Sequence, residues 1–323
     1  MPPLVIVTKL VHVAVGVIVN ADGKILIAKR PVNVHQGGLW EFPGGKVDAG
    51  EMIEQALVRE LYEELAIDVL ASQPLIQIRH HYPDKSVLLD VHKITQFTGS
   101  PIGNEGQPVQ WVDARALEKF EFPAANRPII SAIKLPEKYV ITGPSLDTTD
   151  FIARLHCVLE KGLRIVQLRV ADFNVDTHQS LLDAAMRAVD QSNANLVINC
   201  SLAEYHRAIQ SRSDTTFGLH LNHHHAAVIN QRPVGRQVLF GVSCHNAEEI
   251  VHAQHIGADY LFLSPVLPTD SHPSATLLGW ESFSALVELA NIPVYALGGV
   301  GDGHITMAQS CGAQGVAGIS AWW

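Results

Sequence analysis

The sequence has few cysteines, no excess of positive charge and no long apolar run. Its four cysteines among 323 residues lie far apart and form no CxxC pair, which is typical of free thiols in a reducing compartment. A formal net charge of −9 argues against non-specific binding to nucleic acid or to an anionic membrane. No apolar stretch approaches the roughly 18 residues that a membrane-spanning helix needs.

The first ten residues, MPPLVIVTKL, also lack the basic start, apolar core and cleavage site of a signal peptide. We therefore expect a cytoplasmic protein that acts on small molecules, with neither nucleic acid nor membrane among its partners. An anionic substrate would need a local cation, a metal or a helix N-terminus to offset the negative field. Apolar residues, in contrast, make up 47% of the chain, and its length suits two folded domains.

The first part of the chain, residues 1–134, has the pattern of an α+β domain. One long helical pattern, at residues 51–65, lies between two pairs of β-rich runs. An Asp-Gly turn joins the first pair and a Pro-Asp-Lys turn joins the second, so we expect two hairpins. These elements predict a mixed sheet between helices. The paired runs are residues 11–19 with 24–30 and residues 75–82 with 86–94.

The rest of the chain, residues 135–323, alternates short apolar runs with helical stretches. Such alternation indicates parallel strands joined by crossover helices. Eight runs predict a closed α/β (βα)8 barrel with short loops, because the segment is shorter than the roughly 250 residues of a typical barrel. An open, doubly wound sheet is the alternative. The runs begin at residues 139, 165, 196, 218, 239, 260, 294 and 315.

Three glutamates, Glu60, Glu63 and Glu64, fall on one stripe of the helix at 51–65. The stripe is apolar upstream, so the glutamates should face the protein or line a cleft. Like charges at this spacing repel by a few tenths of a kcal/mol even on an exposed helix, and by more in a cleft that holds no cation. Because carboxylate oxygens suit hard cations, a Mg²⁺ or Mn²⁺ site is the simplest interpretation. A solvated acidic face is the alternative.

The stretch GKVDAGEMIEQALVRELYEELAI, residues 45–67, resembles the Nudix box, a glycine, glutamate and arginine pattern of fixed spacing. The resemblance implies hydrolysis of a nucleoside diphosphate linked to another group. It also implies that the three glutamates bind the metal, with the carbonyl of Gly44 as a further ligand. Arg59 would orient the glutamates, and Glu51 would be structural. Ala66 stands where the family usually has glycine, which puts the end of the helix in doubt.

Two flanking stretches, LWEFPGGK and FPAANRP, are similar to the MutT type of this family, which removes oxidised guanine nucleotides. The resemblance implies that Asn126 reads the oxidised purine, since an amide pairs with both a carbonyl and a ring N–H; a helix cap is the alternative. The stretch NEGQP makes Glu105 a candidate metal ligand or base, or else an ordinary loop carboxylate. Lys29 and Lys46 are candidate phosphate partners, or else solvated.

The barrel-like part resembles thiamine phosphate synthase and its relative, the thiazole tautomerase TenI. The stretches that carry the resemblance include QLR, GLHL, GVSCH, DYLFLSPVLPT, ALGGV and GVAGIS, in this order. The resemblance implies a site for a phosphorylated thiazole-type ligand. Backbone amides would hold the phosphate at the ends of the last two strands, although a tight turn also explains the glycine pair. The substrate-binding residues implied are Gln167, Arg169, Gly298, Gly299 and Gly318.

The same part departs from the synthase pattern at the residues that handle metal and diphosphate. Ala171 and His272 stand in place of lysines, with Ser271 before the second, and Cys200 and His225 stand in place of aspartates. Hard-cation diphosphate chemistry is therefore not expected here.

A tautomerase needs only phosphate binding and a proton shuttle, and His245 matches its proposed catalytic histidine. A helix-capping role for His245 is the alternative. The neighbouring run His223-His224-His225 suggests a transition metal, but without a supporting cysteine or acid a solvated loop is the better interpretation.

Three hypotheses follow for function. The first is a Mg²⁺-dependent pyrophosphohydrolase that converts 8-oxo-dGTP to 8-oxo-dGMP and pyrophosphate, a task of nucleotide-pool sanitation and DNA repair. The second is hydrolysis of normal or damaged thiamine-pathway diphosphates by the same residues, which the joining of the two parts suggests. The third concerns the barrel, which is either a thiazole tautomerase or a non-catalytic sensor of a phosphorylated ligand.

Overall fold

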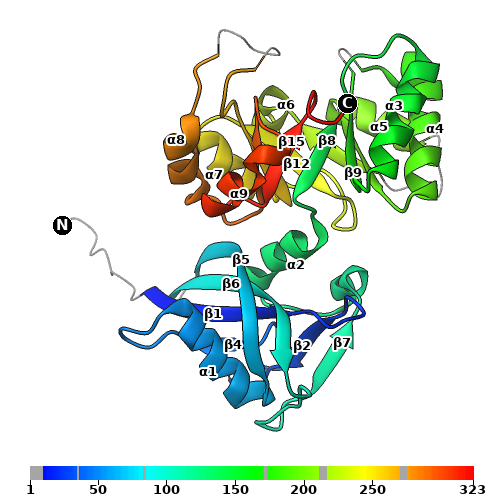
Figure 1. Ribbon diagram of the computed structural model, residues 1–323. Coiled ribbons are helices and arrows are strands. Elements are labelled where there is room, and N and C mark those ends of the chain that lie inside the picture. The colour runs from blue at the N-terminus through cyan, green and yellow to red at the C-terminus, as the bar shows by residue number, and fades with distance from the viewer. Residues whose placement is uncertain (1–9, 35, 83–84, 171–172, 211–216, 270–274) are drawn as a thin grey trace. The chain divides into compact units, whose positions relative to one another are not determined.

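The protein consists of two compact units, Met1–Lys134 and Leu135–Trp323, shown in the computed structural model of Figure 1. The structure describes residues 10–34, 36–82, 85–170, 173–210, 217–269 and 275–323. The segment tested for a signal peptide and the turn expected at Pro83-Asp84 therefore lie largely or wholly outside the described residues.

The first unit contains one mixed and one antiparallel sheet. The mixed sheet has the order β4-β1-β6-β5, with β1 parallel to β6, and the antiparallel sheet has the order β3-β2-β7. The strands are β1 (Leu10–Ile18), β2 (Ile25–Lys29), β3 (Trp40–Glu41), β4 (Gly44–Lys46), β5 (Asp68–His81), β6 (Ser86–Thr98) and β7 (Val109–Val112).

The two expected hairpins have different outcomes. β5 and β6 form a long antiparallel pair, which confirms the second hairpin. The turn of the first hairpin forms, with the N–H of Asn20 bonded to the carbonyl of Lys24 and a bridge between Val19 and Ile25. The strand pairing does not continue beyond it, because β1 and β2 belong to different sheets. Both edges of β1 are already taken by β4 and β6, so β2 turns away to pair with β3 and β7.

Alternating residues of β1 place two helices on opposite faces of the mixed sheet. The helix α1 (Ile53–Leu65) packs Leu57 and Leu61 against Ala14 and Ile18. Val15 and Val17 point the other way, into a core that includes Ile129 of α2 (Arg127–Lys134). The fold class predicted from the sequence, a mixed sheet between helices, is confirmed. Two short 3₁₀ helices, η1 (Ala114–Lys119) and η2 (Ala124–Asn126), precede α2.

The second unit is a closed barrel of eight parallel strands in chain order, which confirms the predicted α/β barrel and excludes the open sheet. The first and last strands close the ring, with Val316 opposite Lys138. The strands are β8 (Lys138–Ile141), β9 (Ile165–Arg169), β10 (Asn195–Asn199), β11 (Gly218–Leu221), β12 (Phe240–Cys244), β13 (Tyr260–Leu263), β14 (Val294–Leu297) and β15 (Gly315–Gly318).

Helices surround this ring, as Figure 1 shows, and apolar side chains fill the space between them and the strands. Inside the ring, Tyr139, Tyr260 and Tyr295 are fully buried beside Phe262. The helices are α3 (Thr148–Glu160), α4 (Val175–Gln191), α5 (Leu202–Gln210), α6 (His223–Ala227), α7 (Ala247–His255), α8 (Gly279–Val287), η3 (Asp302–His304) and α9 (Ile305–Ser310).

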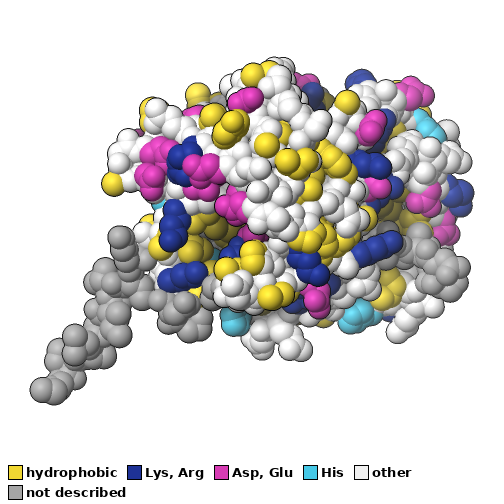
Figure 2. All heavy atoms as spheres, turned by 90° about the horizontal axis from the view of Figure 1, so that it is seen from below, with side chains coloured by type: hydrophobic (Ala, Val, Ile, Leu, Met, Phe, Trp, Pro, Cys, Tyr) yellow, Lys and Arg dark blue, Asp and Glu magenta, His cyan; other side chains and the backbone are white. Residues whose placement is uncertain are grey.

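The face drawn in Figure 2 carries no continuous patch of charged side chains of one sign. Basic and acidic side chains are interspersed there among apolar and polar ones. Within the described residues, no helix is both long and apolar enough to cross a membrane.

Candidate functional site

The start of α1 is organised around Arg59. Its guanidinium binds both carboxylate oxygens of Glu51, at 2.9 and 2.8 Å, and donates to Glu60 at 2.7 Å and to the carbonyl of Lys46 at 3.0 Å. Hydrogen bonds from Arg59 and from the backbone of Asp48 lower the pKa of Glu51 to about 2. Arg59 therefore connects the helix to β4 and fixes the direction of the Glu60 carboxylate.

The glycines of β4 bring the sheet against two of the helix glutamates. A Cβ atom at Gly45 would overlap the carboxylate of Glu60, so only glycine leaves room for that group. The N–H of Gly44 donates to Glu64 at 3.0 Å. Glu60 and Glu64 are partly buried at this contact, whereas the side chain of Glu63 is 55% exposed, more than the shared stripe predicts.

Glu64 lies where negative charge gathers. Burial, the largest cause, and the carboxylates of Glu41, Glu105 and Glu60 together raise its pKa to about 8, against a lowering by the hydrogen bond from Gly44. Glu41 belongs to β3 and is ion-paired with Arg30; burial raises its pKa as well. Four carboxylates thus act on one another within a partly buried space, which is unfavourable unless protons or a cation compensate them.

This donor set suits a hard divalent cation, since every donor side chain is a carboxylate. Across the described ranges, however, no three His, Cys, Asp or Glu side chains already stand in a metal-binding arrangement. The exposed side chains of Glu63 and Glu105 are not drawn in against Glu60 and Glu64 in this arrangement.

The loop that carries Glu105 is fastened to the end of α1. The side chain and backbone of Asn104 donate to the carbonyls of Glu63 and Glu64, both at 2.9 Å, and Gln107 donates to the Glu64 carbonyl at 2.9 Å. The loop therefore satisfies the last carbonyls of the helix. The same contacts hold Glu105 near the other carboxylates.

The helix exit questioned by Ala66 keeps its glycine-like geometry. Ala66 adopts φ 54° and ψ 41°, and its N–H donates to Tyr62. This left-handed conformation strains a residue that carries a Cβ atom, by about 1 kcal/mol. The alanine at position 66 thus adds backbone strain at the end of α1 but leaves the backbone conformation there unchanged.

The remaining candidates of this unit differ in surroundings. The ammonium group of Lys29 lies 5.8 Å from the Trp40 ring, and Lys46 is exposed. Asn126 ends η2, which follows Phe122 in the chain, and the Phe122 ring stacks on Phe42 at 5.3 Å. Its side chain hydrogen-bonds to no other described residue, so its amide is not used as a helix cap within this part of the structure.

In the barrel, Gly298 and Gly299 follow β14 with φ of 96° and 67°. A Cβ atom at either residue would press on the loop at Pro265 to Pro268, so both glycines are required by the turn. The turn also leaves the N–H of Gly299 without a described acceptor. Gly318 ends β15 nearby and approaches the carbonyl of Val300. The tight turn and the phosphate site are therefore compatible interpretations.

Polar side chains line the inside of the barrel. Asn199 donates to Gln167 at 3.2 Å, and Nε2 of this buried glutamine has no partner in the described part of the chain. His220 contacts the hydroxyls of Ser243 at 2.8 Å and Tyr260 at 3.1 Å. Arg169 is exposed at the end of β9. Gln167 and Arg169 thus face different environments.

Two of the positions that depart from the synthase pattern, Cys200 and His225, lie within the described residues, and Nδ1 of His225 is buried there without a described partner. Cys200 is 5% exposed and burial raises its pKa to about 12, so it supplies no thiolate at neutral pH. The backbone N–H of His225 is capped by Asn222. Residues 171, 271 and 272 lie outside the described residues.

The histidine run is not a solvated loop, as the sequence suggested, but forms the short helix α6. Asn222 caps this helix, and His223 and His225 are partly buried. His223 lines a pocket between α6 and α7, and His245, the candidate catalytic histidine, lies beside it.

Sequence reasoning missed Glu41 and Arg30 in the first unit, and His220 and Glu249 in the second. Glu41 lies inside the quoted stretch LWEFPGGK, but no local spacing connects it to the helix glutamates. Its pairing with Arg30, which directly follows the neighbouring strand β2, is visible only in the fold. Alternation of β11, which directs His220 inward between Leu219 and Leu221, could have identified that residue.

Comparison with known proteins supports both resemblances. The chain is 37% identical over 126 residues to the 8-oxo-dGTP diphosphatase of Escherichia coli K12, covering 39% of this chain and 98% of that protein. It is 35% identical over 118 residues to the CTP pyrophosphohydrolase of the same organism, covering 36% and 87%. It is also 34% identical over 189 residues to the putative thiamine-phosphate synthase 2 of Aquifex aeolicus, covering 58% and 98%.

Family models agree with the division of the fold. The model described as NUDIX domain matches residues 14–132, and the model described as thiamine monophosphate synthase matches residues 138–322. The chain therefore belongs to the Nudix hydrolase family through its first unit and to the thiamine monophosphate synthase family through its barrel.

Proposed function

We propose that the first unit is a Mg²⁺- or Mn²⁺-dependent pyrophosphohydrolase that converts 8-oxo-dGTP to 8-oxo-dGMP and pyrophosphate. The observation that carries the proposal is the group of carboxylates gathered at β4, with Glu60 against Gly45 and Glu64 bonded to Gly44. The similarity to 8-oxo-dGTP diphosphatases supports the choice of nucleotide. Removal of oxidised nucleotides from the pool, in support of DNA repair, would be the cellular role.

In this proposal each residue has a separate task. Glu60, Glu63, Glu64 and Glu105, with the carbonyl of Gly44, would hold the cation, which supplies charge neutralisation for the phosphate chain. Arg59 holds the Glu60 carboxylate in place through its hydrogen bond. Lys29 and Lys46 would contact the outer phosphates.

Base recognition would fall to Asn126 and the aromatic residues beside it. The amide of Asn126 has no described hydrogen-bond partner, so it is available to an acceptor and a donor on a purine edge. The stacked pair Phe42 and Phe122 supplies an apolar wall nearby.

Pyrophosphate release in the presence of Mg²⁺ tests the proposal. The substrates are 8-oxo-dGTP, dGTP, CTP, thiamine diphosphate and oxothiamine diphosphate, and we expect 8-oxo-dGTP to give the largest kcat/KM by at least a hundredfold. Glu63→Gln should abolish release, whereas Glu54→Gln, an exposed carboxylate of the same helix, should not. Asn126→Ala should remove the preference for 8-oxo-dGTP over dGTP.

A different winner would overturn the assignment of substrate. The similarity to a CTP pyrophosphohydrolase makes CTP a second candidate. A thiamine compound as the best substrate would place both units in one pathway and would exclude the proposed role of Asn126.

For the barrel we propose an isomerase of a phosphorylated thiazole-type ligand, with phosphate held near Gly298, Gly299 and Gly318 and with His245 as the proton-transferring residue. The absence of thiolate character at Cys200 disfavours metal-dependent diphosphate chemistry. A phosphate-ligand sensor is the non-catalytic alternative. Tautomer conversion of thiazole phosphates followed by NMR separates the two, because binding without conversion would leave only the sensor.

A further inference from the structure

The ends of two neighbouring barrel strands bring histidines together. β11 and β12 are adjacent; His223 begins α6 two residues after β11 ends, and His245 directly follows β12. The centroids of the two rings are 4.7 Å apart, with ring planes at 79°. This is the C-terminal end of the strands, where barrel enzymes carry their catalytic groups.

Glu249 fixes one of the two rings. Its Oε2 atom lies 2.9 Å from Nδ1 of His245 and accepts the backbone N–H of the same residue at 2.8 Å. Asn246 donates to the other carboxylate oxygen at 3.0 Å, so the carboxylate cannot rotate freely. With Nδ1 donating to Glu249, the Nε2 atom of His245 is the one left to exchange protons.

The second ring has no such carboxylate. Burial lowers the pKa of His223, and the neighbouring rings of His245 and His224 lower it further, against a smaller opposing effect of Glu249. The two imidazoles are therefore unequal: one is bonded to a carboxylate, and the charged form of the other is disfavoured. Unequal surroundings of adjacent titratable groups are the usual basis for separate acid and base roles.

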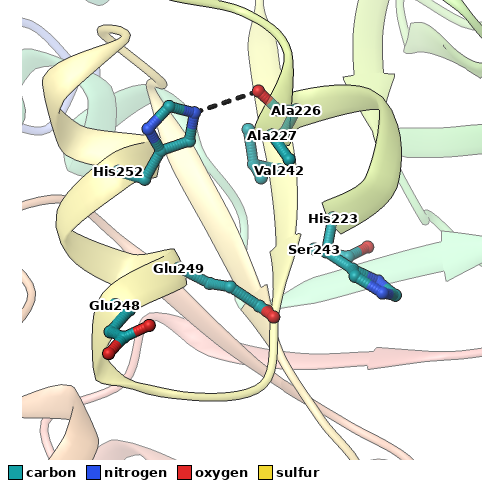
Figure 3. Close-up of a pocket in the computed structure, with 8 residues that line it drawn as sticks. All are labelled: His223, Ala226, Ala227, Val242, Ser243, Glu248, Glu249 and His252. Carbon is teal, nitrogen blue, oxygen red and sulfur yellow. Dashed lines mark hydrogen bonds between the residues drawn. The ribbon is translucent and has the colours of Figure 1, made fainter.

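A pocket between α6 and α7 is lined by His223 and by Glu249, the residue that holds the ring of His245. Ala226, Ala227 and Val242 form its apolar floor, and its empty space is about 510 Å³, part of it open to solvent. In Figure 3 the side chain of Glu249 extends from α7 toward Ser243 and His223. His252, on the far side, is already bonded to the Ala226 carbonyl at 3.0 Å.

We propose that His223 and His245 form a proton-transfer pair, in which His223 removes a proton from a small phosphorylated heterocycle and His245 delivers one to another atom of it. Glu249 is the positioning residue of the pair. The inference rests on the isomerase proposed for the barrel and adds to it a second catalytic base and the residue that orients the first.

The step balances without any further reactant. A C–H or N–H bond of the ligand breaks as an N–H bond forms on His223, and the Nε2–H bond of a protonated His245 breaks as the new bond to the ligand forms. His223 is then charged and His245 neutral. Because the rings are adjacent, one proton passing from His223 to His245, directly or through water, restores the starting state.

Conversion of a thiazole phosphate tautomer by the full chain, followed by NMR in D₂O, tests the pair. We expect His223→Gln and His245→Gln each to slow conversion at least a hundredfold, and Glu249→Gln to slow it about tenfold with little change in KM. His255→Gln is the matched control, because His255 lies on α7, the helix of Glu249, but is exposed and does not line the pocket. Full activity of a folded His223→Gln variant would overturn the inference while leaving the isomerase intact.

Acylation of imidazoles by diethyl pyrocarbonate, mapped by peptide mass spectrometry, tests the pair without any substrate. Glu249 holds Nδ1 of His245 and is not bonded to His223, so Glu249→Gln should change the acylation rate of His245 several-fold and leave that of His223 within about twofold. An unchanged rate at His245 in this variant would overturn the pair, whatever the barrel converts. The expected rates combined with no conversion of the thiazole phosphate would instead remove the proposed substrate and keep the pair.

Discussion

The first unit takes most of its reactive carboxylates from a single helix, whereas the barrel takes its polar groups from the ends of many strands. Glu60, Glu63 and Glu64 lie within five consecutive residues of α1. In the barrel, the candidate groups follow different strands: His223 follows β11, His245 follows β12 and Gly298 follows β14. A site built on one helix depends on what holds that helix against its sheet. A site built on strand ends depends on the closure of the whole ring.

The largest expected effect comes from Gly45→Ala, which tests how tightly the helix site depends on its sheet. The added methyl group would overlap the Glu60 carboxylate, so we expect pyrophosphate release to fall at least a hundredfold, about 3 kcal/mol in the barrier. Gly303→Ala is the control in the barrel, because a Cβ atom there meets nothing within 4 Å. An unchanged kcat/KM in Gly45→Ala would show that catalysis does not require the Glu60 carboxylate to lie against Gly45.

Addition of Mg²⁺ tests whether the carboxylates form one cation site. A ligand at a hundredfold excess over its Kd stabilises the folded state by about 2.7 kcal/mol. We expect Mg²⁺ to stabilise the first unit by this amount, and so to raise the Tm of the first unit alone. Calorimetry with peptide-level hydrogen exchange would assign the transition. Glu64→Gln should remove the rise and Glu54→Gln should keep it. An equal shift of both units would contradict a site confined to the first.

Acidification tests the barrel interior. Burial lowers the pKa of His220 to about 3, from an ordinary value of 6.5, and the groups facing it, Ser243 and Tyr260, are uncharged in this range. Between these two pKa values the unfolded chain binds a proton at His220 that the folded barrel does not. The free energy of unfolding is therefore highest above pH 6.5, as far as His220 determines it, and decreases as the pH falls below that value. At pH 5 the loss is about 2 kcal/mol.

Urea unfolding of the barrel at pH 7 and pH 5 measures this loss. In His220→Gln, the difference between the free energies of unfolding at pH 7 and pH 5 should be smaller by about 2 kcal/mol. Any remaining difference would come from the other titratable groups, which this variant keeps. An unchanged difference in this variant would mean that His220 is not the group whose protonation opposes folding.

The smallest expected effect comes from Ala66→Gly, which removes the left-handed strain at the end of α1. We expect the free energy of unfolding of the first unit to increase by about 1 kcal/mol, or its Tm by about 4 °C. The barrel transition should not move. A decrease instead would show that the Asn104 and Gln107 contacts at this helix end already offset the strain.

The two units also differ in how far the sequence predicts them. The spacing of Glu60 and Glu64 predicts their shared position, because four residues make about one helical turn, and the eight apolar runs predict the barrel. The first signal lies within one helical turn, and the second is built from short runs that can each be recognised locally. The exposed position of Glu63 was not predictable from the same spacing, because it depends on how far the helix rotates against the sheet.

Groups that meet through the fold left no such signal. Glu41 reaches Glu64 only because β3 and α1 are brought together, and His223 meets His245 only because β11 and β12 are neighbours. The wrong interpretation of residues 223–225 as a solvated loop has the same origin. Asn222 caps a helix there, and a five-residue helix is too short to show a periodic pattern.

The pairing of β15 with β8 has a consequence for the order in which the protein is made. During synthesis the first unit has left the ribosome with all its strands while the barrel still lacks its last one. The bond from Gln314 to the carbonyl of Leu135 joins residues 179 apart, so the edges of β8 and β14 stay open until nearly the whole chain has emerged. Nascent barrels with unpaired edges are prone to associate. The first unit is by then complete, so during this interval the open strand edges belong to the barrel alone.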